Sequence, residues 1–382
     1  MTENQQKRIA IFGIKYFPSR GGTSRVVESL LRHINNDYQI TIYCYQHPMA
    51  EKNIPGVKTI QFSEPEIKNF GVFFFFCKCL LHLLVKGKYD LVHVHKTEAS
   101  YFIPFIRLKF PVIATSHEIP YLNSKWGKFG KVYFRLAEWL FMHTGATRTS
   151  ISRPQCEYYE AKYHKSVLYI PNGVSAPQVC PASEKEIFLT KHSIKGPFLF
   201  FAARRIIPLK GCHHFIKALQ LMQYTNPVVI AGDMSQMKEY SDELISQSNN
   251  LDVRFVDYVA SQPLLNALVQ HANIFIFPSE IEGMSMMLLE VAILGTPIIC
   301  SDIPQNRVIF DDSQVLYFKS KDAEDLANKI KFALVNPGIL EDMAQKAKIH
   351  ALNEYGIDRV VDRYKELFNS KLKYNLLHEP AK

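Results

Sequence analysis

Short apolar runs alternate with longer amphipathic segments along most of the 382 residues. The runs are rich in β-branched and aromatic residues, and the segments between them repeat their apolar positions with a helical period. This alternation is typical of parallel sheets built from strand–helix–strand units. Thirteen runs predict strands, at residues 8–13, 39–44, 57–62, 91–95, 112–115, 149–152, 167–170, 198–203, 228–232, 253–257, 274–278, 297–301 and 315–318. The pattern therefore predicts an α/β protein with two doubly wound, Rossmann-like sheets.

The chain is longer than the length at which a single hydrophobic core usually stops growing, so we expect two domains. Residues 175–197 are rich in Pro, Ser and Lys, lack a sustained period and form the predicted linker. We place an N-terminal domain at 1–178, a C-terminal domain at 179–355, and a C-terminal helix within 356–382 that packs back toward the first domain. Ligands of open parallel sheets bind beyond the carboxyl ends of the strands, so a substrate is expected in a cleft between two facing sheets.

Residues 70–88 form the most apolar segment. Its apolar part is shorter than the roughly 20 residues that a membrane span requires, and Lys78 and His82 interrupt it. We expect a helix packed on the first sheet, with an interfacial helix as the alternative. The first residues run from a polar leader into an apolar strand without a signal-peptide pattern, which predicts a cytosolic protein. The seven scattered cysteines favour reduced thiols over a zinc site.

The formal net charge of +9 is unevenly distributed, because the first 180 residues are strongly basic and the remainder is close to neutral. Residues 121–135 interleave cations with aromatic side chains, namely Lys125, Lys128, Lys131, Arg135, Trp126, Phe129, Tyr133 and Phe134. Such a stretch can dock on the inner face of the cytoplasmic membrane, because rings enter the headgroup boundary while cations attract anionic lipid. The alternative places the rings in the core. Nucleic acid is not an expected partner, since no recognised binding module is present.

The strongest motif is PSEIEGMSMMLLEVAILGTPIICSD at residues 278–302, in which Glu282 and Glu290 are the candidate ligand-binding residues. The motif is predicted to run from a strand end through a turn at Glu282 into an apolar helix that stops at Gly295. Seven residues separate Glu282 from Glu290, and in a continuous helix the two would lie about 12 Å apart along the axis. That distance suits two contacts along one extended ligand better than an acid and a base on one bond. Ordinary helix-start and surface carboxylates are the alternative.

The start of this predicted helix suits an anion, because unsatisfied amides and the positive dipole end favour a group such as a diphosphate. The amides belong to Gly283, Met284, Ser285 and Met286. A nucleotide-sugar donor lying across the turn would meet Glu282 at its sugar and Glu290 at its ribose.

A basic loop is predicted between a strand and the next helix in FFAARRIIPLKGCHHFIKAL. Its cations, Arg205 and Lys210, can neutralise the phosphate charge that grows as the bond to a sugar breaks. No Asp-x-Asp pair follows a strand to hold a metal ion, so metal dependence is not expected. A basic loop that is merely solvated is the alternative.

Three further positions are candidates at the edge of the first sheet. Gly21 and Gly22 precede an amphipathic helix and would let backbone approach a phosphate or sugar closely. The G-x-G-x-x-G spacing is absent there, so a nicotinamide dehydrogenase is not supported. His117 directly follows a strand and would bond the donor sugar or phosphate, with a hydrogen-bonded loop histidine as the alternative. Asn172 belongs to a predicted turn that also touches ligand.

Together these motifs resemble glycosyltransferase family 4, and the resemblance covers nearly the whole chain. It rests on Glu282 with Glu290, Arg205 with Lys210-Gly211, Pro171-Asn172-Gly173, Gly21-Gly22 and His117. The resemblance implies the GT-B fold, a UDP-, dTDP- or GDP-linked sugar held chiefly by the C-terminal domain, and an acceptor held by the N-terminal domain. It further implies retention of anomeric configuration, no cofactor, Glu290 on the ribose hydroxyls and Glu282 near the transferred sugar.

A narrower resemblance links HEIPYLNSKWGKFGKVYFRLAEWL to bacterial rhamnosyltransferase-type members. We expect a glycan or lipid-linked acceptor in bacterial surface polysaccharide synthesis, and docking of residues 121–135 on a membrane would favour the lipid-linked one. Arg204 and Asp257 stand where the family often has glycine, which leaves the donor base and sugar open. The alternatives are a nucleotide-sugar epimerase and a catalytically silent carbohydrate-binding assembly subunit. The complete set of Glu282, Glu290, Arg205 and Lys210 argues against the silent subunit.

Overall fold

The computed structural model describes residues 6–19, 22–66, 71–119, 121 and 127–378. The chain forms two compact units. The first contains Met1–Gly173 together with Ile357–Lys382, and the second is Val174–Gly356. The chain therefore leaves the first unit and returns to it for its last helix.

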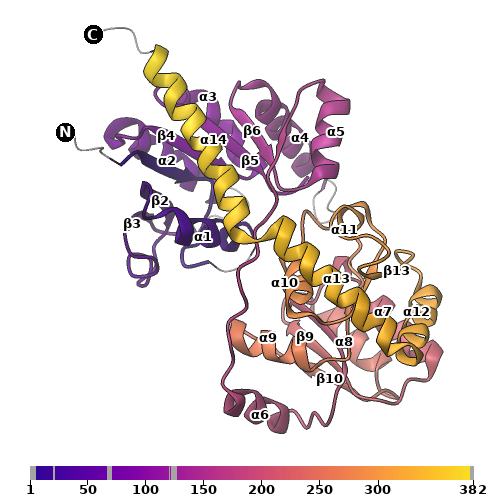
Figure 1. The fold of residues 1–382 in the computed structure, drawn as a ribbon. Coiled ribbons are helices and arrows are strands. Elements are labelled where there is room, and N and C mark those ends of the chain that lie inside the picture. The colour runs from indigo at the N-terminus through magenta and orange to yellow at the C-terminus, as the bar shows by residue number, and fades with distance from the viewer. Residues whose placement is uncertain (1–5, 20–21, 67–70, 120, 122–126, 379–382) are drawn as a thin grey trace. The chain divides into compact units, whose positions relative to one another are not determined.

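The first unit is built on a seven-stranded parallel sheet in the order β3-β2-β1-β4-β5-β6-β7 (Figure 1). The strands are β1 Arg8–Phe12, β2 Gln39–Tyr45, β3 Val57–Phe62, β4 Leu91–His95, β5 Val112–Ser116, β6 Thr147–Ser150 and β7 Leu168–Tyr169. The helices are α1 Thr23–Ile34, α2 Gly71–Lys86, η1 Thr97–Phe102, α3 Ile103–Ile106, α4 Lys128–His143, α5 Arg153–Tyr163 and α14 Ile357–His378.

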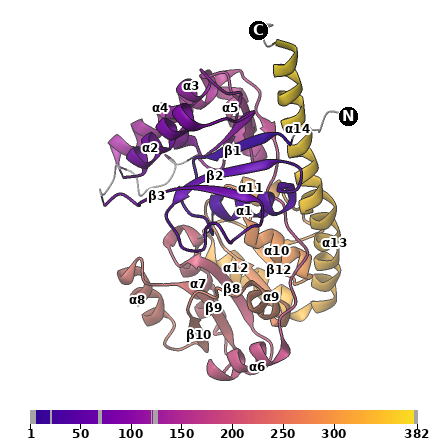
Figure 2. The ribbon, with the colours of Figure 1, turned by 90° about the vertical axis from the view of Figure 1, so that its left-hand side faces the viewer.

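Two hydrophobic cores cover the two faces of this sheet. Alternate side chains of β1 serve them, with Ile9 and Ile11 in one core and Ala10 and Phe12 in the other. The first core is completed by α1 and α14, and the second by α2 to α5. Figure 2 shows α2 and α4 on the opposite side of the strands from α14. A sheet covered on both faces explains why its central strands β1, β4 and β5 consist mostly of apolar residues.

The second unit has a six-stranded parallel sheet in the order β10-β9-β8-β11-β12-β13. Its strands are β8 Leu199–Arg205, β9 Val228–Asp233, β10 Val253–Val256, β11 Ile274–Phe277, β12 Ile298–Ser301 and β13 Leu316–Phe318. The helices are α6 Ala182–Lys191, η3 Pro208–Lys210, α7 Cys212–Met222, α8 Lys238–Gln247, α9 Gln262–His271, α10 Met286–Leu294, α11 Pro304–Arg307, α12 Ala323–Val335 and α13 Pro337–Tyr355.

All thirteen predicted strands are present, so the two doubly wound parallel sheets are confirmed. The observed strand boundaries differ most from the predicted ones at β6, which begins at Thr147, and at β8, which continues to Arg205. The predicted linker is wrong in one respect, because α6 lies within it and belongs to the second unit. This helix has only one buried residue, Leu189, which is why the stretch shows no amphipathic period.

The apolar helix α2 packs on the first sheet, as expected. It buries Phe75, Phe76, Cys79 and Leu83, while Leu81 remains exposed on its other side. Among the helices of the described residues, none has the length and apolarity needed to cross a membrane.

Helix α14 completes the first unit from the far end of the chain. The chain crosses between the units at Gly173 and returns at Ile357, and a Cβ on Gly173 would lie 2.6 Å from the Ile357 side chain and 3.0 Å from its Cα. Val360, Tyr364 and Phe368 then point into the core at helical spacing. The ring of Phe368, fully buried, lies 5.7 Å from that of Tyr38.

This packing predicts that Phe368→Ala destabilises the first unit by about 3–5 kcal/mol, the usual cost of a buried Phe-to-Ala truncation. Urea unfolding followed by tryptophan fluorescence and circular dichroism measures the loss. Glu366→Ala, an exposed site on the same helix, is the matched control and should change stability by less than about 0.5 kcal/mol. Equal stability of the two variants would contradict the role given to α14.

Candidate functional site

Two loops meet at the point where the strand order of the second sheet reverses. Strand β8 pairs with β9 on one side and with β11 on the other. The loops that follow β8 and β11 therefore emerge side by side at the carboxyl edge of the sheet. In open α/β sheets this reversal is the usual place for a ligand.

A glycine allows the two loops to touch through their backbones. Gly211 has a φ of 70°, and a Cβ on it would lie 2.0 Å from the carbonyl oxygen of Pro278. The amide of Glu280 also donates a hydrogen bond to the carbonyl of Leu209, at 2.9 Å. The loop after β8 is thereby held against the loop after β11, and no side chain larger than hydrogen fits between them.

The same contact brings two of the predicted site residues together. Lys210 donates from Nζ to Oε1 of Glu282 at 2.6 Å. The Lys210 side chain is 29% exposed and that of Glu282 only 10%. An ion pair this sheltered fixes the direction of both side chains and leaves the ammonium able to meet a second anion.

The helix after this loop begins later than expected. Helix α10 starts at Met286, and Ser285 caps it by accepting a hydrogen bond from the amide of Leu288 at 3.4 Å. The prediction that the helix opens at Gly283 is therefore wrong by three residues. A serine N-cap competes successfully with helix extension because it satisfies an otherwise unpaired amide. Glu282 lies outside the helix, so the 12 Å helical spacing does not apply.

Glu290 lies on the second turn of α10 and is 7% exposed. An ordinary surface carboxylate is therefore ruled out at this position. Gly283 lies in the loop before the cap, and Met284 is buried there.

Arg205 is the last residue of β8 and is exposed. Its guanidinium donates to the side-chain oxygen of Gln236 at 3.5 Å rather than to Glu282. Of the two predicted cations, Lys210 is thus the one held in the contact between the loops.

Three polar residues beside the ion pair were missed by the sequence analysis. His213 and His214 begin α7, and both rings approach Oε1 of Glu280, at 3.6 and 3.0 Å. Burial opposes ionisation of Glu280, but hydrogen bonds from Lys321 and His214 outweigh it and lower the pKa of the carboxyl. The signal was the His-His pair one residue after Lys210-Gly211 and the second acid two residues before Glu282.

In the first unit, His117 directly follows β5 and is buried rather than lying on an open loop. Its Nε2 lies 3.1 Å from Nδ1 of His95, and the rings of His95 and His93 are 3.9 Å apart. Burial, with Lys96 and His93 nearby, lowers the pKa of His117 to about 3. The ring is therefore neutral at physiological pH and suits a sugar hydroxyl better than a phosphate.

The remaining predicted positions in this unit are spread over several elements. Gly22 precedes α1 with a φ of 57°, whereas Gly21 lies outside the described residues. Asn172 is 1% exposed. It directly precedes the crossing between the units at Gly173.

Helix α4 carries the described part of the predicted membrane face; Lys125 and Trp126 lie outside the described residues. Lys128 and Arg135 are exposed and Lys131 is half-buried. At 100° per residue these cations border an exposed apolar stripe formed by Phe129, Val132, Leu136 and Trp139. The expectation that Tyr133 and Phe134 face outward is wrong, because Tyr133 stacks on Tyr101 and Phe134 is buried. Phe134 lies on the side of the helix opposite the stripe, whereas Tyr133 lies beside the stripe and is half-buried.

Two family models match the chain, one for each unit. Residues 20–176 match Glycosyltransferase Family 4, and residues 184–350 match Glycosyl transferases group 1. The chain is 25% identical over 314 residues to the Escherichia coli UDP-Gal:alpha-D-GlcNAc-diphosphoundecaprenol alpha-1,3-galactosyltransferase, covering 76% of this chain and 77% of that protein.

Solved structures resemble the chain over almost its whole length. Sucrose-phosphate synthase from Thermosynechococcus elongatus matches with a TM-score of 0.81 at 18% identity, covering 96% of this chain and 99% of that one. Anabaena Alr3699/HepE in complex with UDP and glucose matches with a TM-score of 0.77 at 16% identity, covering 96% and 100%. The predicted GT-B fold is thereby confirmed.

The loop contact predicts unequal effects of the same substitution at two glycines. Gly196→Ala should cost about 1–2 kcal/mol, because Gly196 has a φ of 69° with no atom within 4 Å of an added Cβ. Gly211→Ala should cost about 1–3 kcal/mol more, because its Cβ overlaps the Pro278 carbonyl. Thermal and urea unfolding of the purified variants measure the difference. Equal losses would show that the loops separate freely.

Proposed function

The chain is a glycosyltransferase with the GT-B fold, and from this premise we propose a retaining enzyme that transfers a hexose or deoxyhexose without a metal ion. The observation that carries the proposal is the Lys210–Glu282 ion pair at the reversal point of the second sheet. It joins a cation suited to a leaving phosphate with a carboxylate suited to a sugar hydroxyl.

The donor is a nucleoside diphosphate sugar linked to UDP, dTDP or GDP, bound in the second unit. Binding of UDP and glucose by the HepE structure supports this class of donor. The diphosphate lies at the start of α10, over the loop from Gly283 to Ser285 and the amide of Met286, with Arg205 at the rim. The buried carboxylate of Glu290 accepts hydrogen bonds from the ribose hydroxyls.

Transfer begins as the bond between the anomeric carbon and the diphosphate oxygen breaks. Negative charge then grows on the diphosphate, and the Lys210 ammonium stabilises it. Glu282, which orients Lys210 in the free protein, lies near the transferred sugar. The acceptor hydroxyl attacks the anomeric carbon from the same face and gives its proton to the leaving phosphate. No side chain acts as a nucleophile.

The first unit holds the acceptor and part of the donor sugar. Neutral His117 offers a hydrogen bond to a hydroxyl of the donor sugar, and Asn172, Gly21 and Gly22 contribute to donor binding. The E. coli relative acts on a diphosphoundecaprenol-linked sugar, which supports a glycan or lipid-linked acceptor. We place the protein in the cytosol at the inner face of the membrane, in surface polysaccharide synthesis, with the rhamnosyltransferase type as its narrower class.

A nucleotide-sugar epimerase is the rival reaction. It would convert the donor without an acceptor, whereas transfer releases nucleoside diphosphate only when an acceptor is present. A silent carbohydrate-binding subunit would release none. Acceptor-dependent release of nucleoside diphosphate from a donor panel therefore decides among the three.

Lys210→Ala is expected to raise the activation barrier by about 2–4 kcal/mol, because it removes a cation that binds charge developing in the transition state. The loss should appear in kcat rather than in KM, measured by nucleoside diphosphate release. Lys195→Ala, at an exposed lysine before β8, is the charge-matched control. Turnover near that of the wild type in a folded Lys210→Ala variant would remove Lys210 from the mechanism.

The exposed face of α4 predicts binding to anionic membranes. Vesicles containing anionic lipid should co-sediment the protein, less so as salt rises, since each nearby cation adds about 1 kcal/mol. Reversing Lys128 and Arg135 to Glu should abolish binding, and Phe129→Ser should weaken it.

The matched control reverses Lys52 and Lys58, two exposed lysines of the same unit, and should bind vesicles as the wild type does. Absence of binding by the wild type at low salt would favour a soluble acceptor.

A further inference from the structure

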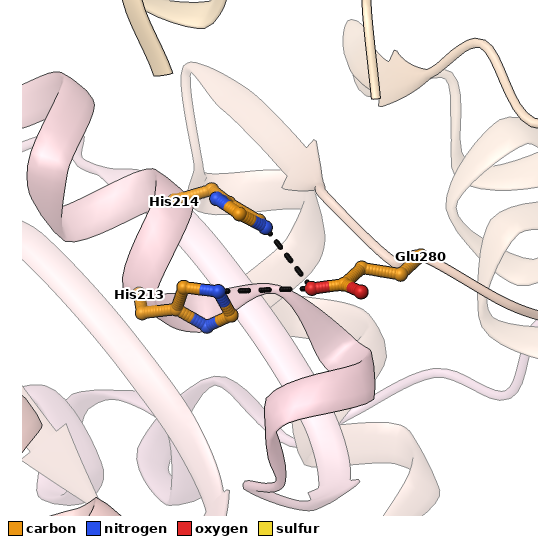
Figure 3. Close-up of side chains that lie close together, drawn as sticks. All are labelled: His213, His214 and Glu280. Carbon is orange, nitrogen blue, oxygen red and sulfur yellow. Dashed lines mark hydrogen bonds and ion pairs between the residues drawn. The ribbon is translucent and has the colours of Figure 1, made fainter. Parts of the chain in front are cut away.

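A cluster of metal-ligating side chains lies next to the Lys210–Glu282 pair and has no part in the proposed transfer. It consists of His213, His214 and Glu280, whose ligand atoms all lie within 4.8 Å of one another. Within the described part of the chain, these residues are the one such group of His, Cys, Asp or Glu side chains. Figure 3 shows both imidazole rings directed at the same carboxylate oxygen.

Two separations between the ligand atoms lie close to those of a tetrahedral zinc site, and all of them are within 4.8 Å. Zinc bonds of 2.0–2.2 Å at tetrahedral angles place neighbouring ligand atoms about 3.4 Å apart. The carboxylate oxygen Oε1 of Glu280 lies 3.6 Å from Nε2 of His213 and 3.0 Å from Nε2 of His214. Small rotations of the side chains would therefore admit an ion without movement of the backbone.

The chemical character of the donors selects the kind of metal. Two imidazoles with one carboxylate suit zinc and related transition metals, whereas magnesium and calcium prefer oxygen ligands. The side chains are also sheltered from water, with exposed fractions of 32% for His213, 15% for His214 and 14% for Glu280.

Tyr240 supplies the outer contact that a metal-binding histidine requires. The backbone amide of His213 donates to the Tyr240 hydroxyl oxygen at 3.3 Å, and Nδ1 of the same ring lies 2.8 Å from that oxygen. With a proton on Nδ1 donated to Tyr240, the lone pair on Nε2 faces Glu280 and is available to a metal. The hydroxyl of Tyr240 on α8 thus orients the ring of His213 on α7.

The ammonium of Lys321 competes with a metal ion for the carboxylate of Glu280. This ammonium lies 3.1 Å from Oε2 of Glu280, on the oxygen that the histidines do not approach. The Lys321 side chain is 63% exposed, so it can turn into solvent when an ion neutralises the carboxylate.

We infer that His213, His214 and Glu280 form a binding site for a zinc-type divalent transition-metal ion, with water as the fourth ligand. A bound ion would join the first turn of α7 to the loop after β11. These are the segments that carry Gly211 and Glu282, so the ion would reinforce the loop contact already made by Gly211 and Pro278. The inference does not rest on the proposed transfer, and the ion takes no part in the reaction.

The test uses the full-length chain, stripped with EDTA and desalted, with metal alone and no nucleotide sugar. Calorimetric titration with Zn²⁺ should show one ion per chain, and Co²⁺ should give the visible absorption of a four-coordinate site. Mg²⁺ should give no binding. Because no donor is present, failure here leaves the transferase proposal untouched.

Variants distinguish this site from adventitious binding. His214→Ala and Glu280→Gln should each weaken Zn²⁺ binding more than tenfold, and Tyr240→Phe by about tenfold or more. Lys321→Gln should strengthen binding, because it removes the competing ammonium. His192→Ala, at a half-buried histidine of the same unit outside the cluster, is the control and should bind as the wild type does.

Thermal melting in EDTA establishes that each variant is folded. If His214→Ala or Glu280→Gln does not fold, the opposite shifts expected of Tyr240→Phe and Lys321→Gln carry the test. Equal Zn²⁺ affinity in the wild type and in folded Glu280→Gln would overturn the inference, as would an octahedral Co²⁺ spectrum.

Discussion

Close backbone approach at the reversal point of each sheet is the constraint on which the rest of the molecule depends. In the second unit Gly211 lies against the Pro278 carbonyl, and in the first unit a Cβ on Gly13 would lie 2.0 Å from the carbonyl oxygen of His95. Both contacts join the loop after the central strand to the end of the strand that starts the second half of the sheet. Because the loops are held in contact, polar side chains on one loop can reach those on the other, as Lys210 reaches Glu282.

Burial gives the two units different chemistry at these equivalent places. In the first unit, desolvation lowers the pKa values of His93, His95 and His117 and keeps the rings neutral, so they act as directional hydrogen-bonding groups. In the second unit, Lys210 and Glu282 stay paired and half-sheltered. Neutral rings suit hydroxyl groups as hydrogen-bonding partners, whereas a paired ammonium and carboxylate suit a site for charged groups.

The periodic part of the structure was predictable from the sequence, because both faces of each sheet are covered and most strands are rich in apolar residues. Features that depend on one or a few residues, such as the start of a helix, were not predictable. Ser285 starts α10 three residues later than the motif suggested, and α6 formed in a stretch with one buried residue.

Contacts between distant parts of the chain were not predictable either. Lys210 and Glu282 were identified separately, but their ion pair depends on the contact of Gly211 with Pro278. Pro278 is 67 residues from Gly211 in the chain, so no local pattern indicates the contact. The prediction that Tyr133 and Phe134 face outward was wrong for a related reason. Tyr133 stacks on Tyr101, which lies on another element.

Helix α14 has a consequence for the order in which the protein is completed during synthesis. The second unit is continuous in sequence and can close its core as soon as its last helix leaves the ribosome. The first unit, although translated earlier, keeps the surface around Ile9, Ile11 and Tyr38 uncovered until Val360, Tyr364 and Phe368 emerge. Nascent chains therefore carry an exposed apolar face through most of translation, and a ribosome that stalls before residue 357 releases a product that chaperones and proteases recognise as unfinished.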